Sequence, residues 1–191
     1  MVTKTALSTA KYFANRNFYK NDEVDIYKYG FELLFSTILN TLSIMIISLY
    51  MNIFIEGILF LFAVVSLRIT AGGYHAKGHW SCFLVNNITY LIFAVLLKYL
   101  LADYLLYYTL LSVITASTII WFLAPIEAKN KPLSDRKKAK VRTASLVIAL
   151  INIILVLVFI SINLTETFIA YYISGMLAAS ISLIAAKILY K

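Results

Sequence analysis

The chain has 191 residues and contains little charge, few prolines and glycines, and a single cysteine. Charged residues make up 14% and apolar residues 62% of it, against roughly 25% and 45–50% in soluble globular domains. This composition excludes an ordinary soluble domain and places the chain in a bilayer. The lone thiol, Cys82, cannot form an internal disulfide, which excludes a disulfide-stabilised secreted scaffold.

Long apolar stretches recur along the chain, and crossing a hydrocarbon core of about 30 Å takes roughly 20 helical residues. Six spans are predicted, at residues 31–50, 53–67, 82–101, 104–124, 144–162 and 167–186. The second is short for a full crossing. Because these stretches lack the alternation of a β-barrel strand, the predicted fold is all-α: a polytopic integral membrane protein forming a single membrane domain over residues 1–191.

The distribution of Lys and Arg predicts the orientation. Basic residues gather in segment 1–28, the break 68–82, the loop 124–143 and the C-terminus, whereas the other three connections carry none. Since basic residues in short loops favour the cytoplasmic side, both termini are predicted to be cytoplasmic. Lys98 is an exception near the outer end of the third span. It is expected to snorkel to the outer interface or to line an interior polar path.

Segment 1–28 does not look like a secretory signal, because it has no continuous apolar core and carries charges throughout its length. Aromatic residues among basic ones predict an amphipathic helix at the cytoplasmic interface. This helix is either a membrane-surface anchor or a surface that helps to hold an amphipathic substrate or partner.

The polar break at 68–82 contains the residues best suited to chemistry. It holds both histidines, half of the six glycines and the cysteine: His75, His79, Gly72, Gly73, Gly78 and Cys82. The adjacent glycines are expected to end a helix or to allow positive φ. If the third span begins between residues 79 and 82, the thiol lies in the first helical turn, where the helix dipole favours thiolate. The alternative is a free cysteine that packs as a small apolar residue.

Either histidine could act as the base for Cys82. On a helix His79 lies at i, i+3 from Cys82, so spacing favours it. His75 would stand about 10 Å away along one unbroken helix, and could approach only if the chain departs from a helix near Gly78.

A metal site is the other chemical alternative. His75, His79, Cys82 and Asn86 would form one polar stripe on a helix, and such a stripe could hold zinc or copper. The stripe offers three good ligands and has no Asp or Glu nearby to orient the imidazoles, which argues against a metal.

The loop at 124–143 is strongly basic. Its charge is typical of an orientation signal that binds anionic lipid headgroups, or of a surface that recognises an acidic peptide. A nucleic-acid partner is not expected, because no soluble domain or aromatic stacking platform accompanies the charge.

One family resemblance is carried by several motifs. The run from Arg68 to Ala76, RITAGGYHA, is followed by Cys82 seven residues after its histidine, and Ala124-Pro125 by the NKPLS run at 130–134. With the length and the spans, these motifs resemble the AgrB (accessory gene regulator protein B) family over essentially the whole chain.

The resemblance implies a multi-pass protein of the bacterial cell membrane with its active site facing the cytoplasm. It implies a cysteine endopeptidase, with Cys82 as nucleophile and His75 rather than His79 as base, that matures a quorum-sensing peptide through a thioester. The product would be a thiolactone or lactone macrocycle. The expected partner is a short AgrD-like precursor with an amphipathic leader and an acidic tail, and no cofactor is expected. A homodimer is also expected, and small residues of the sixth span could serve it: Gly175, Ala178, Ala179 and Ser182.

Further roles follow as hypotheses. Residues that could position the substrate or its oxyanion are Arg68, Gly72, Gly73 and Asn86; residues that could bind the acidic tail are Lys129, Lys131, Lys137, Lys138, Lys140 and Arg142. Two other classes stay open: a small transporter or permease, for which Glu56 and Lys98 are the intramembrane charges, and a binding or metal-holding membrane protein without this chemistry.

Overall fold

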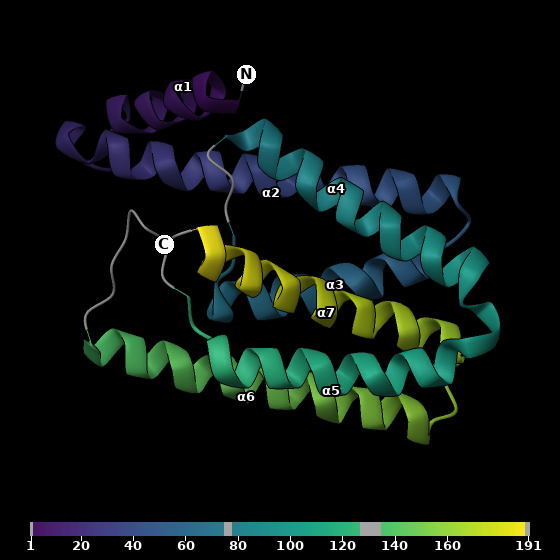
Figure 1. Ribbon diagram of the computed structural model, residues 1–191. Helices are drawn as coiled ribbons and strands as arrows, with labels where there is room; N and C mark the ends of the chain where they lie inside the picture. The colour runs from purple at the N-terminus through teal and green to yellow at the C-terminus, as the bar shows by residue number, and fades with distance from the viewer. Residues whose placement is uncertain (1, 75–77, 127–134, 190–191) are drawn as a thin grey trace.

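The computed structural model describes residues 2–74, 78–126 and 135–189, and the secondary structure of this part of the chain is almost entirely helical. The seven α-helices are α1 (Val2–Asn15), α2 (Val24–Tyr50), α3 (Phe54–Ala71), α4 (His79–Val95), α5 (Leu105–Leu123), α6 (Asp135–Ser161) and α7 (Glu166–Leu189) (Figure 1). Short turns complete the path: a 3-10 turn, η1 (Asn21–Glu23), a π-helical turn, η2 (Leu96–Leu100), and a second 3-10 turn, η3 (Ala102–Tyr104). The described residues contain no strand, so the predicted all-α class is confirmed.

Six of the described helices, α2 to α7, are long and apolar enough to cross a membrane. Each overlaps one predicted span. The second span was predicted too short, because α3 continues to Ala71 and has 18 residues, a length of about 27 Å. The first span was also underestimated, since α2 begins at Val24 and has 27 residues. In both cases the helix continues beyond the apolar run into a stretch with charged residues, so the predicted end fell inside the helix.

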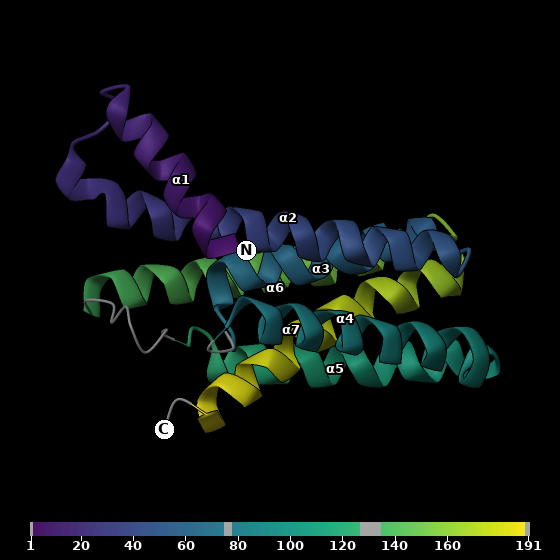
Figure 2. The same ribbon diagram turned by 90° about the horizontal axis from the view of Figure 1, so that it is seen from above.

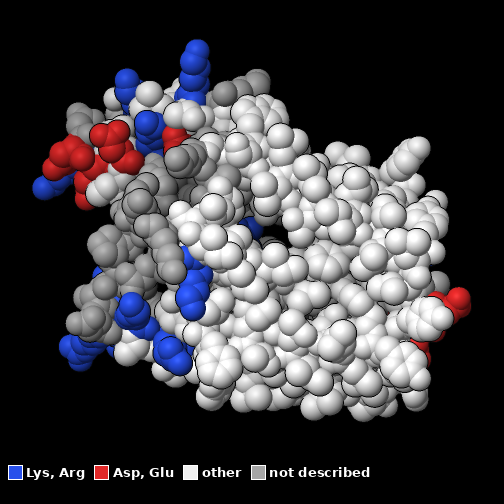
Figure 3. Space-filling view, viewed as in Figure 1, with Lys and Arg blue, Asp and Glu red and all other residues white. Residues whose placement is uncertain are grey.

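The charges of the molecule gather at its ends. On the face shown in Figure 3, basic and acidic side chains crowd at one end, a few acidic ones lie at the other, and the broad surface between them is almost free of charge. This distribution is the one expected of a protein embedded in a bilayer. Which end faces the cytoplasm stays a prediction from the loop charges.

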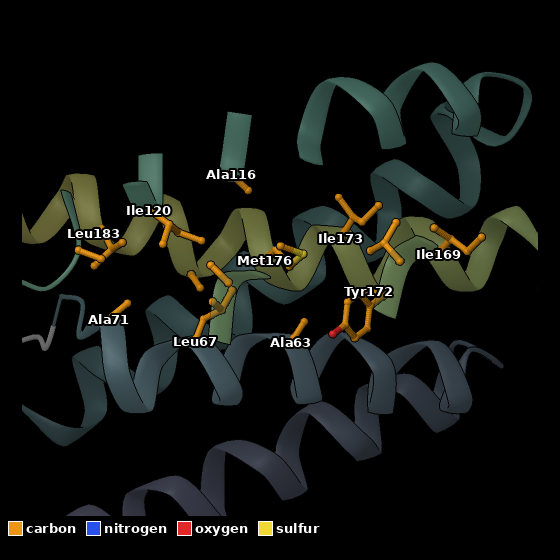
Figure 4. Close-up of a cluster of buried hydrophobic side chains, with 14 residues drawn as sticks. Ala63, Leu67, Ala71, Ala116, Ile120, Ile169, Tyr172, Ile173, Met176 and Leu183 are labelled. Carbon is orange, nitrogen blue, oxygen red and sulfur yellow. The ribbon is translucent and has the colours of Figure 1, made fainter. Parts of the chain in front are cut away.

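The central helix of the bundle is α7, which packs against α3 and α5 and is the most buried span. Its apolar face meets those of α3 and α5 in one cluster (Figure 4), which includes Ala63, Leu67, Ala71, Ala116, Ile120, Ile169, Tyr172, Ile173, Met176 and Leu183. Because lipid is as apolar as these side chains, close packing and hydrogen bonds must hold the helices together.

The small residues of α7 serve this packing within the chain. A Cβ at Gly175 would lie 2.4 Å from the carbonyl oxygen of Phe60 and 2.8 Å from Cβ of Ala63, so only glycine allows this approach of α7 to α3. Ala178 and Ala179 are buried inside the same chain. The face proposed for a homodimer is therefore already occupied, and it gives no support to a dimer.

A second layer is formed by α2 and α4, which pack against each other and, through α2, against α3. Polar pairs join them: Ser43 Oγ donates to Asn87 Oδ1 at 2.7 Å, and the hydroxyls of Ser48 and Tyr90 lie 2.6 Å apart. Polar side chains in a membrane span are satisfied in this way by a neighbouring helix. The contact between α2 and α4 thus contains at least two polar side-chain pairs.

The N-terminal helix α1 lies outside the six long helices and packs on the first half of α2 (Figure 2). Ala6, Ala10 and Ala14 recur every four residues and are buried in this contact. The predicted N-terminal helix is therefore present. Its position at a membrane interface stays a prediction, as does the grouping of all 191 residues in one domain.

Candidate active site between α3 and α4

The break after α3 is shaped by two glycines. Helix α3 ends at Ala71, and Gly72 and Gly73 then take φ values of 79° and 144°, which L-residues with a side chain rarely adopt. A Cβ at Gly72 would also lie 2.5 Å from the carbonyl oxygen of Ile126. The predicted end of the helix at the glycine pair is confirmed.

The chain that follows these glycines is held between two distant segments. Gly72 forms a backbone bridge with Ile126, whose N–H donates to the Ala71 carbonyl at 3.1 Å. The N–H of Tyr74 donates to Ser182 of α7, with the carbonyl oxygen at 3.0 Å and Oγ at 2.9 Å. The start of the break is therefore fixed by α7 and by the segment after α5.

Helix α4 begins at His79, after Gly78 in an extended conformation with φ −137° and ψ 150°. The N–H of Cys82 donates to the Gly78 carbonyl at 3.0 Å, so the thiol lies in the first turn. This confirms that the chain departs from a helix at Gly78. Consequently, the helix that carries Cys82 does not continue back through Gly78.

The proposed dyad itself falls outside the description. His75 is not among the described residues, and of His79 the backbone is described but not the side chain. The choice between the two as the base therefore stays a prediction.

A polar cluster joins α3 to α4 beside the thiol. In the last turn of α3, Arg68 donates from Nη1 to Asn86 Oδ1 at 3.0 Å and from Nη2 to the Tyr74 carbonyl at 2.7 Å. The amide nitrogen of Asn86 in turn lies 3.6 Å from Sγ of Cys82, within hydrogen-bond distance for sulfur. The thiol is partly buried. Of the sequence candidates, Arg68, Asn86 and Cys82 are thus brought together.

The glycines also contribute to this cluster. A Cβ at Gly73 would lie 2.6 Å from Ser182 Oγ and 3.6 Å from Nε of Arg68. The absence of a side chain at Gly73 thus allows the backbone to pass between Arg68 and α7. Gly73 thus lets the backbone of the break lie close to both Ser182 and Arg68, and Arg68 in turn contacts the residues around the thiol.

The basic candidates are arranged differently from the prediction. Residues 135–143, predicted as part of a loop, are helical, because α6 begins at Asp135. Helix formers such as Lys, Arg and Ala fill this stretch. The exposed basic side chains on it are Arg136, Lys137, Lys138, Lys140 and Arg142, whereas Lys129 and Lys131 lie outside the described residues.

The two intramembrane charges give little support to a transport path. Lys98, in η2, donates from Nζ to the carbonyl oxygen of Met51, the residue that caps the end of α2, and its ammonium lies 5.5 Å from the ring centre of Tyr99. This satisfies a helix-terminal carbonyl at the connection between α2 and α3. Glu56 lies in the first turn of α3, close to the same connection.

Within the described ranges, no group of three His, Cys, Asp or Glu residues could hold a metal ion. Of the predicted stripe, His79, Cys82 and Asn86 belong to α4, and His75 lies outside the described residues.

Comparison with known proteins bears on this break. The profile of the family described as AgrB, Accessory gene regulator B, matches residues 6–184. The chain belongs to the AgrB family. Membership implies a role in the processing of an autoinducing peptide, and it agrees with the six membrane-spanning helices.

Three curated AgrB relatives are similar to this chain. AgrB-like protein 2 of Clostridium perfringens (strain 13) is 29% identical over 82% of this chain and 72% of its own length. An AgrB-like protein of C. perfringens (strain SM101) is 29% identical over 64% of this chain and 59% of its own length. A third, from Clostridium acetobutylicum, is 31% identical over 58% of this chain and 52% of its own. The chain thus spans less than two thirds of the length of two of these AgrB relatives. No solved structure matches it.

The sequence of this AgrB protein did not predict that α2 and α7 contribute residues to the site around Cys82. Asn40 of α2 accepts from the amide of Asn86 at 3.5 Å, and Ser182 of α7 binds Tyr74. A signal for Asn40 existed, because an amide inside an apolar span needs a polar partner. Nothing in the sequence identified which partner it has.

Proposed function

We propose that this AgrB protein is a membrane-embedded cysteine endopeptidase that removes the C-terminal tail of a quorum-sensing precursor peptide and allows the remainder to cyclise. The observation that supports it best is the environment of Cys82. The thiol lies in the first turn of α4, directly after the break, and an amide fixed by Arg68 lies 3.6 Å from its sulfur. A cysteine that merely fills space needs none of these features.

The proposed reaction has two acyl-transfer steps. His75 takes the proton of the Cys82 thiol, and the sulfur attacks the carbonyl carbon of the residue before the tail. The C–N bond then breaks, the leaving amine receives the proton from His75, and an acyl-enzyme thioester remains. A cysteine thiol or serine hydroxyl of the precursor then attacks this thioester, forms the ring as a thiolactone or lactone, and returns the free thiol of Cys82.

Arg68 is proposed to organise the site. Its guanidinium joins Asn86 of α4 to the Tyr74 carbonyl in the break, and hydrogen bonds to a charged donor contribute about 1.5–3 kcal/mol each. Arg68 would hold the break, which carries His75, against the helix that carries Cys82. Gly72 and Gly73 would allow that backbone path, and a substrate carbonyl could meet the N–H groups at the start of α4.

The start of α6 is proposed to attract the acidic tail of the precursor. Lys137, Lys138, Lys140 and Arg142 are exposed on the stretch of α6 before its apolar part. At physiological salt such charges act over about 8 Å, so they would raise the local concentration of the tail without fixing its geometry. Lys129 and Lys131 would extend this charge along the chain. Basic residues on one side also support a cytoplasmic site, which a precursor leader lying on that surface could reach.

The test is a processing assay with the purified protein in liposomes and a synthetic precursor. Cys82→Ser and His75→Ala are expected to abolish cleavage, and His79→Ala is the matched control that retains it. With a precursor that lacks its cyclising cysteine, mass spectrometry should detect an acyl adduct on Cys82. Cleavage by Cys82→Ser would exclude Cys82 as the nucleophile, whereas a parent protein that does not cleave the precursor would favour a transporter or a binding protein.

A further inference from the structure

Two side-chain amides from different helices lie in series beside the Cys82 thiol. We propose that Asn40 of α2 is a positioning residue for this thiol and acts through Asn86 of α4, which donates a hydrogen bond to the sulfur. The inference deepens the proposed cysteine chemistry and rests on it. It adds α2, a helix far from the motif in sequence, to the catalytic site.

The orientation of the Asn86 amide follows from its neighbours. A guanidinium can only donate, so the group that faces Arg68 Nη1 at 3.0 Å must be the carbonyl oxygen of Asn86. The NH₂ group therefore points the other way, to Cys82 Sγ at 3.6 Å and to Asn40 Oδ1 at 3.5 Å. Reversing the amide would place two donors opposite each other at Arg68 and two acceptors opposite each other at Asn40.

The amide of Asn40 is fixed in the same manner. Its NH₂ group donates to the Ser36 carbonyl, one turn earlier in α2, at 2.8 Å. Its oxygen is therefore the atom presented to Asn86, as an acceptor. Each of the two amides is thus oriented by a partner that cannot exchange roles: an arginine on one side and a helix carbonyl on the other.

This arrangement places a donor beside the sulfur that acts as nucleophile in the proposed reaction. A donor 3.6 Å from sulfur can interact with the negative charge that develops there when the base takes the thiol proton. Among the described side chains that contact the two amides, Arg68 of α3 carries the charge, and its sign acts in the same direction. The partners from α2 and α4, Ser36 and Asn40 with Asn86, are neutral.

The second amide keeps the first one in place. With Asn40 present, Asn86 is held at its oxygen by Arg68 and at its nitrogen by α2 as well as by sulfur. Without Asn40, the NH₂ group lacks one acceptor in an apolar setting and can turn away from the thiol. The contact between Asn40 and Asn86 is long at 3.5 Å, so its effect on Cys82 should be smaller than that of Asn86 itself.

The chain offers a matched control on the same interface. Ser43 Oγ donates to Asn87 Oδ1 at 2.7 Å, and Asn87 donates to the Phe83 carbonyl at 2.8 Å. This pair also joins α2 to α4 through polar atoms, but it is separate from the contacts of the Cys82 sulfur. Asn87→Ala and Ser43→Ala therefore report any general loosening of the two helices.

Because Cys82 is the only cysteine, the rate of its reaction with a thiol reagent reports this site alone. The experiment measures alkylation of the full-length protein in liposomes by iodoacetamide between pH 5 and 10. Asn86→Asp keeps the acceptor for Arg68 and replaces the donor to sulfur with a carboxylate. It should slow alkylation at pH 7 by about tenfold or more. Asn40→Leu should slow alkylation at the same pH by about threefold.

Two results would overturn the inference, because each would show that Asn40 has no specific action on the thiol. Either Asn40→Leu leaves the alkylation rate unchanged, or the control Asn87→Ala slows alkylation equally. Thermal unfolding of each variant shows whether it folds. If Asn40→Leu does not fold, Asn40→Ala is measured in its place. This result is independent of the processing assay: cleavage by Cys82→Ser would exclude Cys82 as the nucleophile, whereas an unchanged alkylation rate would refute only the role of Asn40.

Discussion

Arg68 and Asn86, eighteen residues apart and on different helices, are joined by a hydrogen bond of 3.0 Å. The same guanidinium binds the Tyr74 carbonyl at 2.7 Å. One residue thus connects the helix of the proposed nucleophile to the break that carries the proposed base. The geometry of the site depends on this connection more than on any contact within α4.

Replacing Arg68 with lysine should therefore impair processing although the charge is kept. An ammonium is a compact donor on a flexible stem and lacks the planar fork that reaches Asn86 and Tyr74 at once. We expect at least a tenfold loss of precursor cleavage in liposomes. Arg142→Lys, on the exposed start of α6, is the matched control and should retain the parental rate; equal loss in both variants would contradict the role of Arg68.

Substitution by alanine should have different effects at Gly73 and at Gly78, the glycines on either side of the part of the break that the structure does not describe. Gly73 has a φ of 144°, and a Cβ there would lie 2.6 Å from Ser182 Oγ, whereas nothing lies within 4 Å of a Cβ at Gly78. Gly73→Ala should lower cleavage strongly and destabilise the protein by about 1–3 kcal/mol. Gly78→Ala should be tolerated. The check is cleavage together with thermal unfolding in detergent; comparable effects at both positions would argue against the described backbone path.

The basic start of α6 should affect substrate binding more than chemistry. Changing Lys137, Lys138, Lys140 and Arg142 together to glutamine is expected to raise KM for an acid-tailed precursor several-fold and to leave kcat nearly unchanged. The difference from the parent should shrink at high salt, because exposed charges are screened. Lys4→Gln with Lys11→Gln, on α1, is the control. If KM rises equally for a precursor with a neutral tail, the basic residues do not recognise the acidic tail.

The close approach of α3 and α7 predicts a stability defect at Gly175. Alanine there would place Cβ 2.4 Å from the Phe60 carbonyl oxygen, so the two central helices must separate. A cost of about 1–3 kcal/mol is expected, as for other overpacked cores. Gly30→Ala is the control, since no atom lies within 4 Å of a Cβ at that position. The measurement is the unfolding temperature of each variant, and a Gly175→Ala value equal to the parent would contradict this packing.

The sequence was a good guide to the helices and a partial guide to the site. Composition and run length predicted six spans because lipid leaves helices as the means of satisfying backbone groups, and the glycine pair predicted where α3 ends. The sequence did not predict the helical start of α6, although its Lys, Arg and Ala residues are good helix formers, because a cluster of charge beside an apolar span is typical of a loop as well as of a helix end.

By itself, the sequence determined the membrane class, the helical content, the break at Gly72–Gly78 and the family, since each of these depends on local composition or on a motif. The tertiary structure decided which distant residues meet: Arg68 with Asn86, Asn40 with Asn86, and Tyr74 with Ser182. These contacts join residues that lie 18, 46 and 108 positions apart. They arise from how the helices pack, and packing in lipid depends on small residues and polar pairs that no local pattern specifies.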